Sequence, residues 1–238
     1  ACIEVPRQEA SGFGVMAVDE NGLITDFIEK PADPPAMQGK PDMSLCSMGV
    51  YVFNAKYLYA ELARDIDDPA SDHDFGKNII PHAVAAAHSF SRSCIVAPDE
   101  QFREHYWRDA GTIDAYWDAN IDLTATVPAL NLYDRNWPVW TYQQQLPPAK
   151  FVHNHLDRRG NAIESSVSSG CIVSGEVNRS LLFSGCRVHS YSRVNLSVIL
   201  PDSTIGSRAR LSHCVVDSDC DIPPNMVVGE NPEEDARR

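Results

Sequence analysis

Two features that would define whole classes of protein are missing from this chain of 238 residues. No run of about 18 apolar residues occurs, so we expect no helix that spans a membrane. The seven cysteines form no C-x-x-C motif, and they are scattered and odd in number. This pattern argues against a zinc site or a disulfide framework. We therefore expect reduced thiols, no signal peptide and a cytoplasmic location.

Positive charge is also scarce. The chain has 20 Lys and Arg residues against 33 Asp and Glu, which gives a net charge of −13. That balance argues against general binding to nucleic acids or to anionic membranes. It does not exclude a phosphorylated small molecule, because a few local cations and a metal ion can balance that charge. The apolar share of 43% is sufficient for a buried core in one large or two small domains.

Strands are expected early in the chain. Residues 14–30 predict a hairpin, because Asn21-Gly22 is a strong turn signal between two alternating segments. The proline-rich stretch after Lys30 then predicts a loop. The apolar run SMGVYVFNA (47–55) predicts a buried strand.

Three helices are predicted in the same part of the chain. Their expected bounds are 56–65, 74–87 and 112–124, with Asn54 as the cap of the first, a break near Pro81 in the second and a loop at 105–112 before the third. Two of them have an apolar face, formed by Tyr57, Leu58 and Leu62 in the first and by Ile113, Tyr116, Trp117 and Ile121 in the third. Strands that alternate with helices predict an α/β layered domain over residues 1–126.

The character of the sequence changes after residue 126. Residues 127–151 contain four prolines and no clean period, which is typical of a linker. A repeat of 17 residues follows, with one aliphatic residue every five or six positions. Its three columns are Val177, Val194, Leu211 and Val228; Leu182, Ile199 and Val216; and Val188, Ile205 and Ile222. This period predicts a three-sided β-solenoid over residues 152–238, with an irregular first coil at 160–176. The alternative is chance alternation in an antiparallel β-domain.

Candidate ligand-binding residues lie at the ends of the predicted strands. Glu29 and Lys30 could bind sugar hydroxyls and a phosphate, although most such residues are only solvated. Ser47 could donate a hydroxyl group or simply begin a strand. Gly14 could allow close approach of a ligand or serve only in a turn.

Asp109 in YWRDAGT is the candidate metal ligand. A hard cation such as Mg²⁺ prefers carboxylate oxygen and takes few protein ligands. The plain alternative is that Asp109 caps the following helix.

Taken in order, these motifs resemble the bacterial ADP-glucose pyrophosphorylase (glucose-1-phosphate adenylyltransferase) family. The resemblance runs over essentially the whole chain. The matching segments are FGVMAVDENG, FIEKPADPP, SMGVYVFNA, SDHDFGKNIIP, YWRDAGTIDAYW, NLYDRNWPVWTY, LPPAKFV and VVGENPEEDARR. The resemblance implies an α/β fold: the C-terminal half of a Rossmann-like nucleotidyltransferase domain (1–126), a linker (127–151) and a left-handed parallel β-helix (152–238).

The resemblance also implies the chemistry. The family joins ATP and α-D-glucose 1-phosphate to give ADP-glucose and pyrophosphate for glycogen synthesis, with Mg²⁺ as cofactor. Lys30 would bind the phosphate of glucose 1-phosphate and Glu29 the glucose hydroxyls, with Gly14 and Ser47 completing the sugar pocket. Asp109 would be one of two metal-binding aspartates. Family members are homotetramers regulated by sugar-phosphate and nucleotide effectors, and Arg208 and Arg210 are candidate effector ligands or ordinary exposed residues.

One departure from the family pattern is large. The family's Gly-rich, Arg-containing loop for the ATP phosphates does not occur here. We therefore expect an internal fragment of such an enzyme that does not turn over ATP by itself. Two alternatives remain: another sugar-phosphate nucleotidyltransferase, such as a guanylyl- or uridylyltransferase, and a non-catalytic β-helix assembly module.

Overall fold

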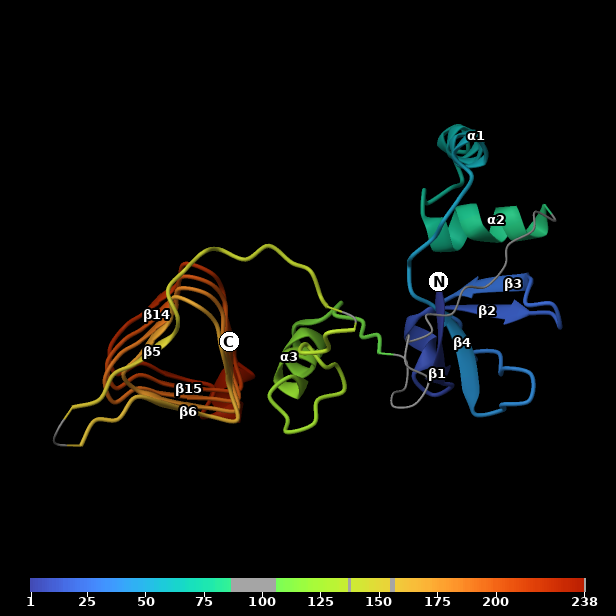
Figure 1. Cartoon of the computed structure of the whole chain (residues 1–238). Coiled ribbons are helices and arrows are strands. Elements are labelled where there is room, and N and C mark those ends of the chain that lie inside the picture. The colour runs from blue at the N-terminus through green and yellow to red at the C-terminus, as the bar shows by residue number, and fades with distance from the viewer. Residues whose placement is uncertain (87–105, 137, 155–156, 238) are drawn as a thin grey trace. The chain divides into compact units, whose positions relative to one another are not determined.

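The structure is a computed structural model that describes residues 1–86, 106–136, 138–154 and 157–237 (Figure 1). The chain divides into two compact units, Ala1–Trp107 and Arg108–Arg238. No helix in the described part of the chain is long and apolar enough to cross a membrane.

The first unit contains a four-stranded antiparallel sheet with the strand order β1-β4-β2-β3. Its strands are β1 (Cys2–Pro6), β2 (Gly14–Val18), β3 (Ile24–Glu29) and β4 (Met43–Ser47). The predicted hairpin is confirmed, since β2 pairs with β3 from Gly14 opposite Glu29 onwards. Its turn is held by Asp19, whose carboxylate accepts hydrogen bonds from the backbone of Asn21 and Leu23.

The first unit also contains four helical elements among its described residues, of which the first lies between β1 and β2 and the others follow β4. They are the 3₁₀-helix η1 (Ala10–Gly12), α1 (Ala55–Ile66), the π-helix η2 (Phe75–Ile79) and α2 (Ile80–Ala85). Asn54 caps α1 as predicted, because its side chain accepts from the amides of Lys56 and Tyr57. The predicted break near Pro81 is also confirmed, because η2 changes to α2 there. Ile80 joins α2 to a core of Cys2, Met16, Phe27 and Leu45 on the sheet.

The buried strand predicted at 47–55 is wrong. Strand β4 ends at Ser47, and Gly49 adopts a left-handed backbone with φ of 68°, which ends the ladder. Val52 is 94% exposed. Among the described residues of this unit the sheet is antiparallel, and α1, η2 and α2 come after its last strand. The parallel strands that the structure describes lie in the second unit.

The second unit begins with a loop and α3 (Ile113–Asp122), which Thr112 caps by accepting from the amide of Ala115. Tyr116, Trp117 and Ile121 pack on the solenoid strands that contain Leu181 and Val198. The indole of Trp117 donates to the carbonyl oxygen of Leu196 at 2.8 Å. Ile113 departs from the predicted apolar face, because it is 76% exposed.

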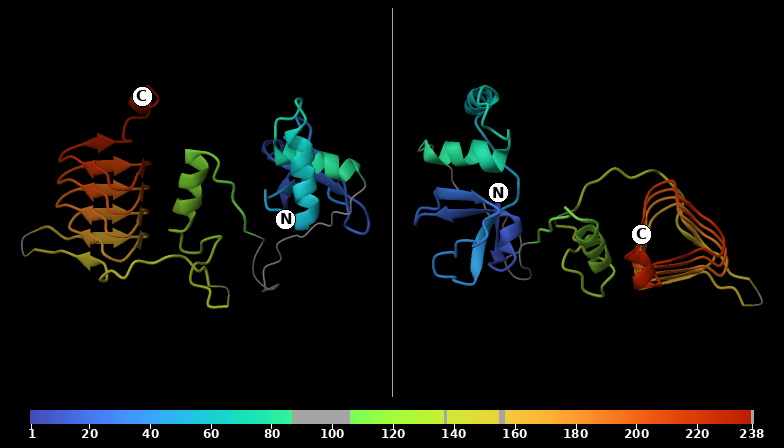
Figure 2. Two further views of the ribbon diagram at one scale, coloured as in Figure 1. Left: turned by 90° about the horizontal axis from the view of Figure 1, so that it is seen from above. Right: turned by 180° about the vertical axis from the view of Figure 1, so that it is seen from behind.

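The rest of the second unit is a parallel β-helix with three flat sides (Figure 2). Its first side contains β6 (Asn161–Ile163), β9 (Glu176–Asn178), β12 (Arg193–Asn195), β15 (Arg210–Ser212) and β18 (Val227–Val228). Its second side contains β7 (Ser166–Val167), β10 (Leu181–Leu182), β13 (Val198–Ile199) and β16 (Val215–Val216). Its third side contains β5 (Lys150–Phe151), β8 (Ile172–Val173), β11 (Arg187–Val188), β14 (Thr204–Ile205) and β17 (Asp221–Ile222).

The strand registers confirm the predicted columns. Val194 pairs with Val177 and with Leu211, and Ile199 pairs with Leu182 and with Val216. The third column is equally in register, from Val188 through Ile205 to Ile222. These aliphatic side chains fill a continuous core, which is how a solenoid obtains its stability.

Residues 127–149 contain no helix or strand among their described positions. Strand β5, at the end of the predicted linker, pairs with β8, so that solenoid pairing includes Lys150 and Phe151. A short helix, α4 (Pro232–Asp235), follows the last coil.

Candidate functional site

The carboxylate of Glu29 lies at the end of β3, closely bordered by backbone. Gly14 faces it across the hairpin, and a Cβ atom on Gly14 would lie 2.8 Å from Glu29 Oε2 and 2.6 Å from Phe27 Cζ. Gly76 borders the same carboxylate from η2, where a Cβ atom would collide with Glu29 Oε2. Glycine at both positions therefore makes room for the Glu29 side chain.

The π-helix that carries Gly76 is itself an unusual element. Such single π turns are rare and are frequent at functional sites. Asp74 caps η2 by accepting from the amide of Lys77 at 2.9 Å. Lys77 also donates to Asp72 at 2.8 Å, and this hydrogen bond raises the pKa of Lys77.

Lys30 follows Glu29 in a left-handed backbone conformation with φ of 47°. Its amide donates to the carbonyl oxygen of Phe13 at 3.0 Å, which fixes this turn of the chain. Its ammonium nitrogen lies 3.9 Å from Glu29 Oε1, and its side chain is 66% exposed. A cation held only at this long distance can meet an anionic ligand from solvent.

Ser47 is buried at the end of β4, where its hydroxyl group hydrogen-bonds with Tyr51 at 2.9 Å and accepts from the amide of Gly49. Tyr51 stacks on Phe75 with the ring centroids 6.1 Å apart. Burial raises the pKa of Tyr51, and the negative charges of Glu29 and Asp74 raise it further. Contacts link these residues into one group. Glu29 borders Gly14, Gly76 and Lys30, and Gly76 borders Asp74. Ser47 joins them through Tyr51, which stacks on Phe75, the neighbour of Gly76 in η2.

Sequence reasoning did not identify Tyr51, Asp74 or Gly76 as site residues. One signal was present, because Gly76 lies inside the segment 74–87 that was predicted to be a helix. A glycine in a helix interior is unfavourable by about 1 kcal/mol relative to alanine, so it usually has a packing or functional reason.

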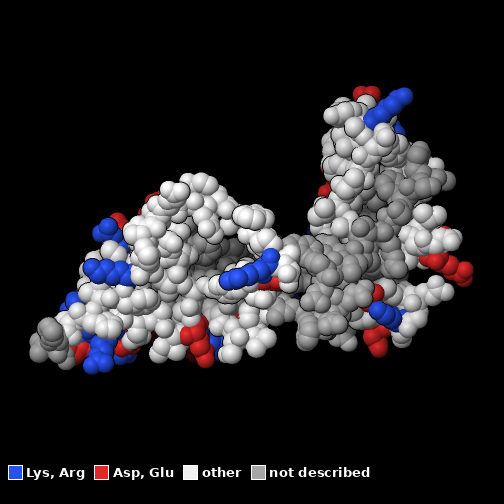
Figure 3. Space-filling view, viewed as in Figure 1, with Lys and Arg blue, Asp and Glu red and all other residues white. Residues whose placement is uncertain are grey.

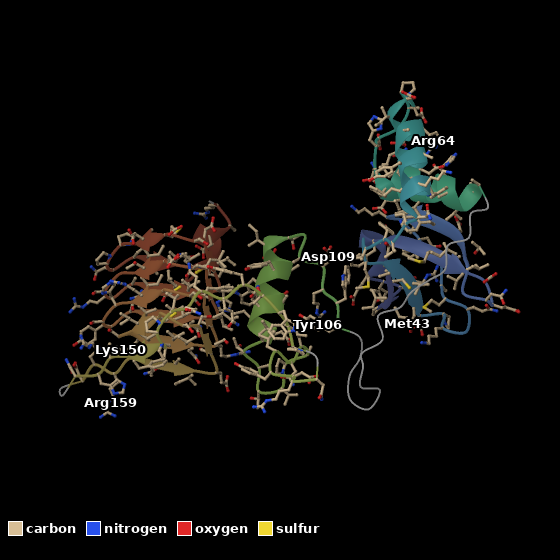
Figure 4. The ribbon with its side chains drawn as sticks, turned by 45° about the horizontal axis from the view of Figure 1, so that its top comes forward. Met43, Arg64, Tyr106, Asp109, Lys150 and Arg159 are labelled. Carbon is tan, nitrogen blue, oxygen red and sulfur yellow. The ribbon has the colours of Figure 1, made fainter. Side chains whose placement is uncertain are left out.

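Asp109 is exposed in the loop before α3 (Figure 4). Its carboxylate is in contact distance of Gly111, where a Cβ atom would lie 3.4 Å from both oxygens. It belongs to the second unit, so a joint site with Lys30 stays a prediction. Thr112, and not Asp109, caps α3, so the plain alternative for Asp109 is wrong. No group of three or more His, Cys, Asp or Glu residues in the described ranges could hold a metal ion.

The candidate effector residues lie on the solenoid. Arg210 forms a salt bridge with Glu230 at 2.9 Å, and the guanidinium of Arg208 lies 5.5 Å from the ring centroid of Tyr191. Both arginines line one hollow of the solenoid surface.

Comparison with protein families agrees with this architecture. Residues 1–126 match the family described as nucleotidyl transferase, and residues 147–238 match the family described as GlmU-like, C-terminal hexapeptide. These matches define the class of protein: a nucleotidyl transferase domain joined to a hexapeptide-repeat solenoid. It belongs to the nucleotidyl transferase family.

Individual relatives match over the whole chain. The glucose-1-phosphate adenylyltransferases of Bradyrhizobium diazoefficiens and of Rhodopseudomonas palustris strain BisB18 are 56% and 58% identical to it, and each match covers 100% of this chain and 57% of the relative. That of Granulibacter bethesdensis is 55% identical, with 100% of this chain and 58% of the relative covered. The chain therefore spans less than two thirds of the length of these relatives.

Proposed function

We propose that this chain is part of a glucose-1-phosphate adenylyltransferase, which converts ATP and α-D-glucose 1-phosphate into ADP-glucose and pyrophosphate in glycogen biosynthesis. The observation that carries the proposal is the Glu29 carboxylate, bordered by the backbones of Gly14 and Gly76 and adjacent to the exposed ammonium of Lys30. The names of the relatives, which match over the whole chain, support the same assignment.

The chemistry follows from the groups at this site. A phosphate oxygen of glucose 1-phosphate attacks the α-phosphorus of ATP in line, a new P–O bond forms, and pyrophosphate leaves with the electrons of the broken bond. Lys30 would bind the phosphate of the sugar, and Glu29 would accept hydrogen bonds from glucose hydroxyls. The hydroxyl groups of Ser47 and Tyr51 lie 2.9 Å apart and would complete the polar wall. The contribution of these residues is positioning and electrostatic stabilisation.

Mg²⁺ is the cofactor that we propose for this reaction. The exposed Asp109 offers hard carboxylate oxygens, which fit an ion that usually takes one or two carboxylates together with water and substrate phosphates. When bound, the ion would offset negative charge on the phosphates. We propose that the ATP phosphates are bound by the part of the enzyme that the relatives have beyond the matched region.

Assembly and regulation are further parts of the proposal. We propose a cytoplasmic homotetramer, to whose contacts the exposed aromatic side chains of Tyr133, Trp140 and Tyr142 contribute. We also propose that sugar-phosphate or nucleotide effectors bind at Arg208 and Arg210.

The substitution Lys30→Ala in the full-length enzyme tests the catalytic assignment. We expect the KM for glucose 1-phosphate to rise by about 100-fold, because a charge-assisted hydrogen bond to the phosphate is lost, while the KM for ATP changes little. Lys56→Ala is the matched control, since Lys56 is an exposed lysine on α1. An equal rise in both KM values would contradict the role of Lys30.

The nucleotide is tested separately. Initial rates with ATP, UTP, GTP and dTTP are measured with the same enzyme. We expect turnover with ATP alone. Comparable turnover with another nucleotide would instead indicate a different sugar-phosphate nucleotidyltransferase.

A further inference from the structure

One edge of the solenoid carries a hollow of about 470 Å³. It is lined by Asp157, Tyr191, Arg193, Arg208 and Arg210. All five belong to the second unit, and Lys and Arg side chains gather along this edge of the solenoid in Figure 3. A hollow of this volume is in the range of small-molecule sites.

The hollow lies where one corner of the solenoid is shortened. Four residues connect β11 to β12, whereas only Ser174 and Gly175 connect β8 to β9 in the coil below. A Cβ atom on Gly175 would lie 2.5 Å from the side chain of Ser192, so the tight corner requires glycine. Asp157 and Arg158 contact this corner, because Asp157 accepts from the hydroxyl group of Tyr191 at 3.1 Å and Arg158 donates to Ser190 at 2.9 Å.

Two of the arginines are direct neighbours. Arg193 on β12 and Arg210 on β15 are in register on adjacent parallel strands, an arrangement that is unfavourable for like charges without compensation. Glu176 pairs with Arg193 at 3.3 Å, and Glu230 pairs with Arg210. The carboxylate of Glu230 accepts hydrogen bonds from Nε and Nη2 of Arg210. Nη1 of Arg210 can therefore donate to another acceptor.

Arg208 has the least compensated charge of the three. It makes no ion pair with the described residues, and its guanidinium group lies over the ring of Tyr191. Its backbone is left-handed with φ of 62°, a conformation that is unfavourable for a side chain of this kind. Asn225 occupies the equivalent corner of the next coil with φ of 64°, and asparagine tolerates it better.

A fourth arginine, Arg158, contacts the same edge through its hydrogen bond to Ser190. Arg158 Nε is buried and has no hydrogen-bond partner among the described residues. The local excess of arginine contrasts with the net charge of −13 of the whole chain.

We infer that this hollow, which we call the corner pocket, binds the phosphate group of a small phosphate monoester. Guanidinium groups match the geometry of phosphate oxygens, and three of them line one hollow. Among the described residues that line it, the one carboxylate is that of Asp157, which accepts a hydrogen bond from Tyr191. The inference extends the proposal that effectors bind at Arg208 and Arg210. Its regulatory meaning rests on that proposal. It does not depend on the catalytic proposal, because binding is measured directly.

The test is a titration of the 238-residue protein with inorganic phosphate and with glycerol 3-phosphate, at constant ionic strength. The titration is made with Lys30 intact and again in a Lys30→Ala background, where the proposed catalytic phosphate site does not contribute. Binding is followed by the ¹H–¹⁵N signals of the arginine side chains. We expect saturable binding that Arg208→Asn weakens by about tenfold or more, because one charge-assisted contact is lost.

Arg179→Asn is the matched control. Arg179 also occupies a left-handed solenoid corner, with φ of 44°, but it lies on another edge and pairs with Glu164. Its substitution should leave the affinity for phosphate unchanged. Both variants place asparagine where the backbone favours it, so folding should be retained.

Equal affinity in the Arg208→Asn and Arg179→Asn proteins would overturn the inference, as would the absence of saturable binding in the Lys30→Ala protein. If phosphate binds only when Lys30 is intact, the corner pocket is wrong while the proposed catalytic site is supported. Failure of the catalytic proposal has a different signature, which is an unchanged KM for glucose 1-phosphate in the Lys30→Ala enzyme.

Discussion

At the scale of single residues, the site depends on glycines as much as on charged groups. Glu29 and Lys30 attract attention in the sequence because a strand ends on two charges before a proline. Their environment is less visible there, since Gly76 and Tyr51 come from segments that were interpreted as a helix interior and a buried strand. The residue types showed which charged groups could bind a ligand. The space around Glu29 depends on the backbones of Gly14 and Gly76, which are distant in the sequence and come together only in the folded chain.

Gly76→Ala is expected to destabilise the first unit by about 1–3 kcal/mol, because the added methyl group overlaps the Glu29 carboxylate. Urea unfolding of the 238-residue protein measures the change. Gly12→Ala is the control, since a Cβ atom there meets nothing within 4 Å. In a Glu29→Ala background the cost of Gly76→Ala should largely disappear. A cost that persists there would show that contact with Glu29 is not its cause.

At the scale of elements, the solenoid could be predicted more closely than the first unit, where the hairpin and α1 were correct but the strand at 47–55 was not. The inward residues of the solenoid recur at fixed spacing, and each coil repeats the same contacts, so local sequence contains most of the information. Strand β4 and its neighbourhood were mispredicted because composition does not show that Gly49 turns the chain. Helix α1 shows a further limit. Its most buried positions are Glu61 and Asp65, which are satisfied by partners from later in the chain, including His82 and His73.

Asp65 makes the packing of α1 dependent on pH. Hydrogen bonds from His73 and Ser71 hold the pKa of Asp65 below its ordinary value of 3.8. A depressed carboxylate pKa contributes stability above the unfolded-state value, and this contribution is lost as the pH falls through the folded-state value. Asp65→Asn should therefore lower the free energy of unfolding at neutral pH, and the difference from wild type should shrink below a pH of about 4.

Chemical denaturation at a series of pH values measures this difference. Asp67→Asn, at an exposed position beside the end of α1, should show a small difference at every pH. A constant difference between wild type and Asp65→Asn down to strongly acidic pH would contradict the assigned role of the Asp65 hydrogen bonds.

At the scale of the whole molecule, the chain has two sets of hydrophobic cores. Among the described residues, one set is built from the sheet and helices of the first unit, and the other from the solenoid and α3. The sequence predicted a boundary at residue 126, which is also the limit of the nucleotidyl transferase match. Contacts in the fold instead group α3 with the solenoid, because Trp117 and Ile121 pack on it. Helix α3 lies at the end of the first domain in the sequence, but its packing contacts are with the solenoid that follows.

Because the two units have separate cores, we expect each unit to unfold independently of the other. Leu45→Ala removes a fully buried side chain from the first unit and should destabilise it by about 2–5 kcal/mol. Hydrogen exchange in mild urea should then accelerate in peptides from β1 to β4, while peptides from β9 to β18 keep their protection. Leu182→Ala, at an equally buried position of the solenoid, should give the reverse pattern. If either variant accelerated exchange equally in both units, the two cores would unfold as one cooperative structure, and α3 could not be assigned to the solenoid on energetic grounds.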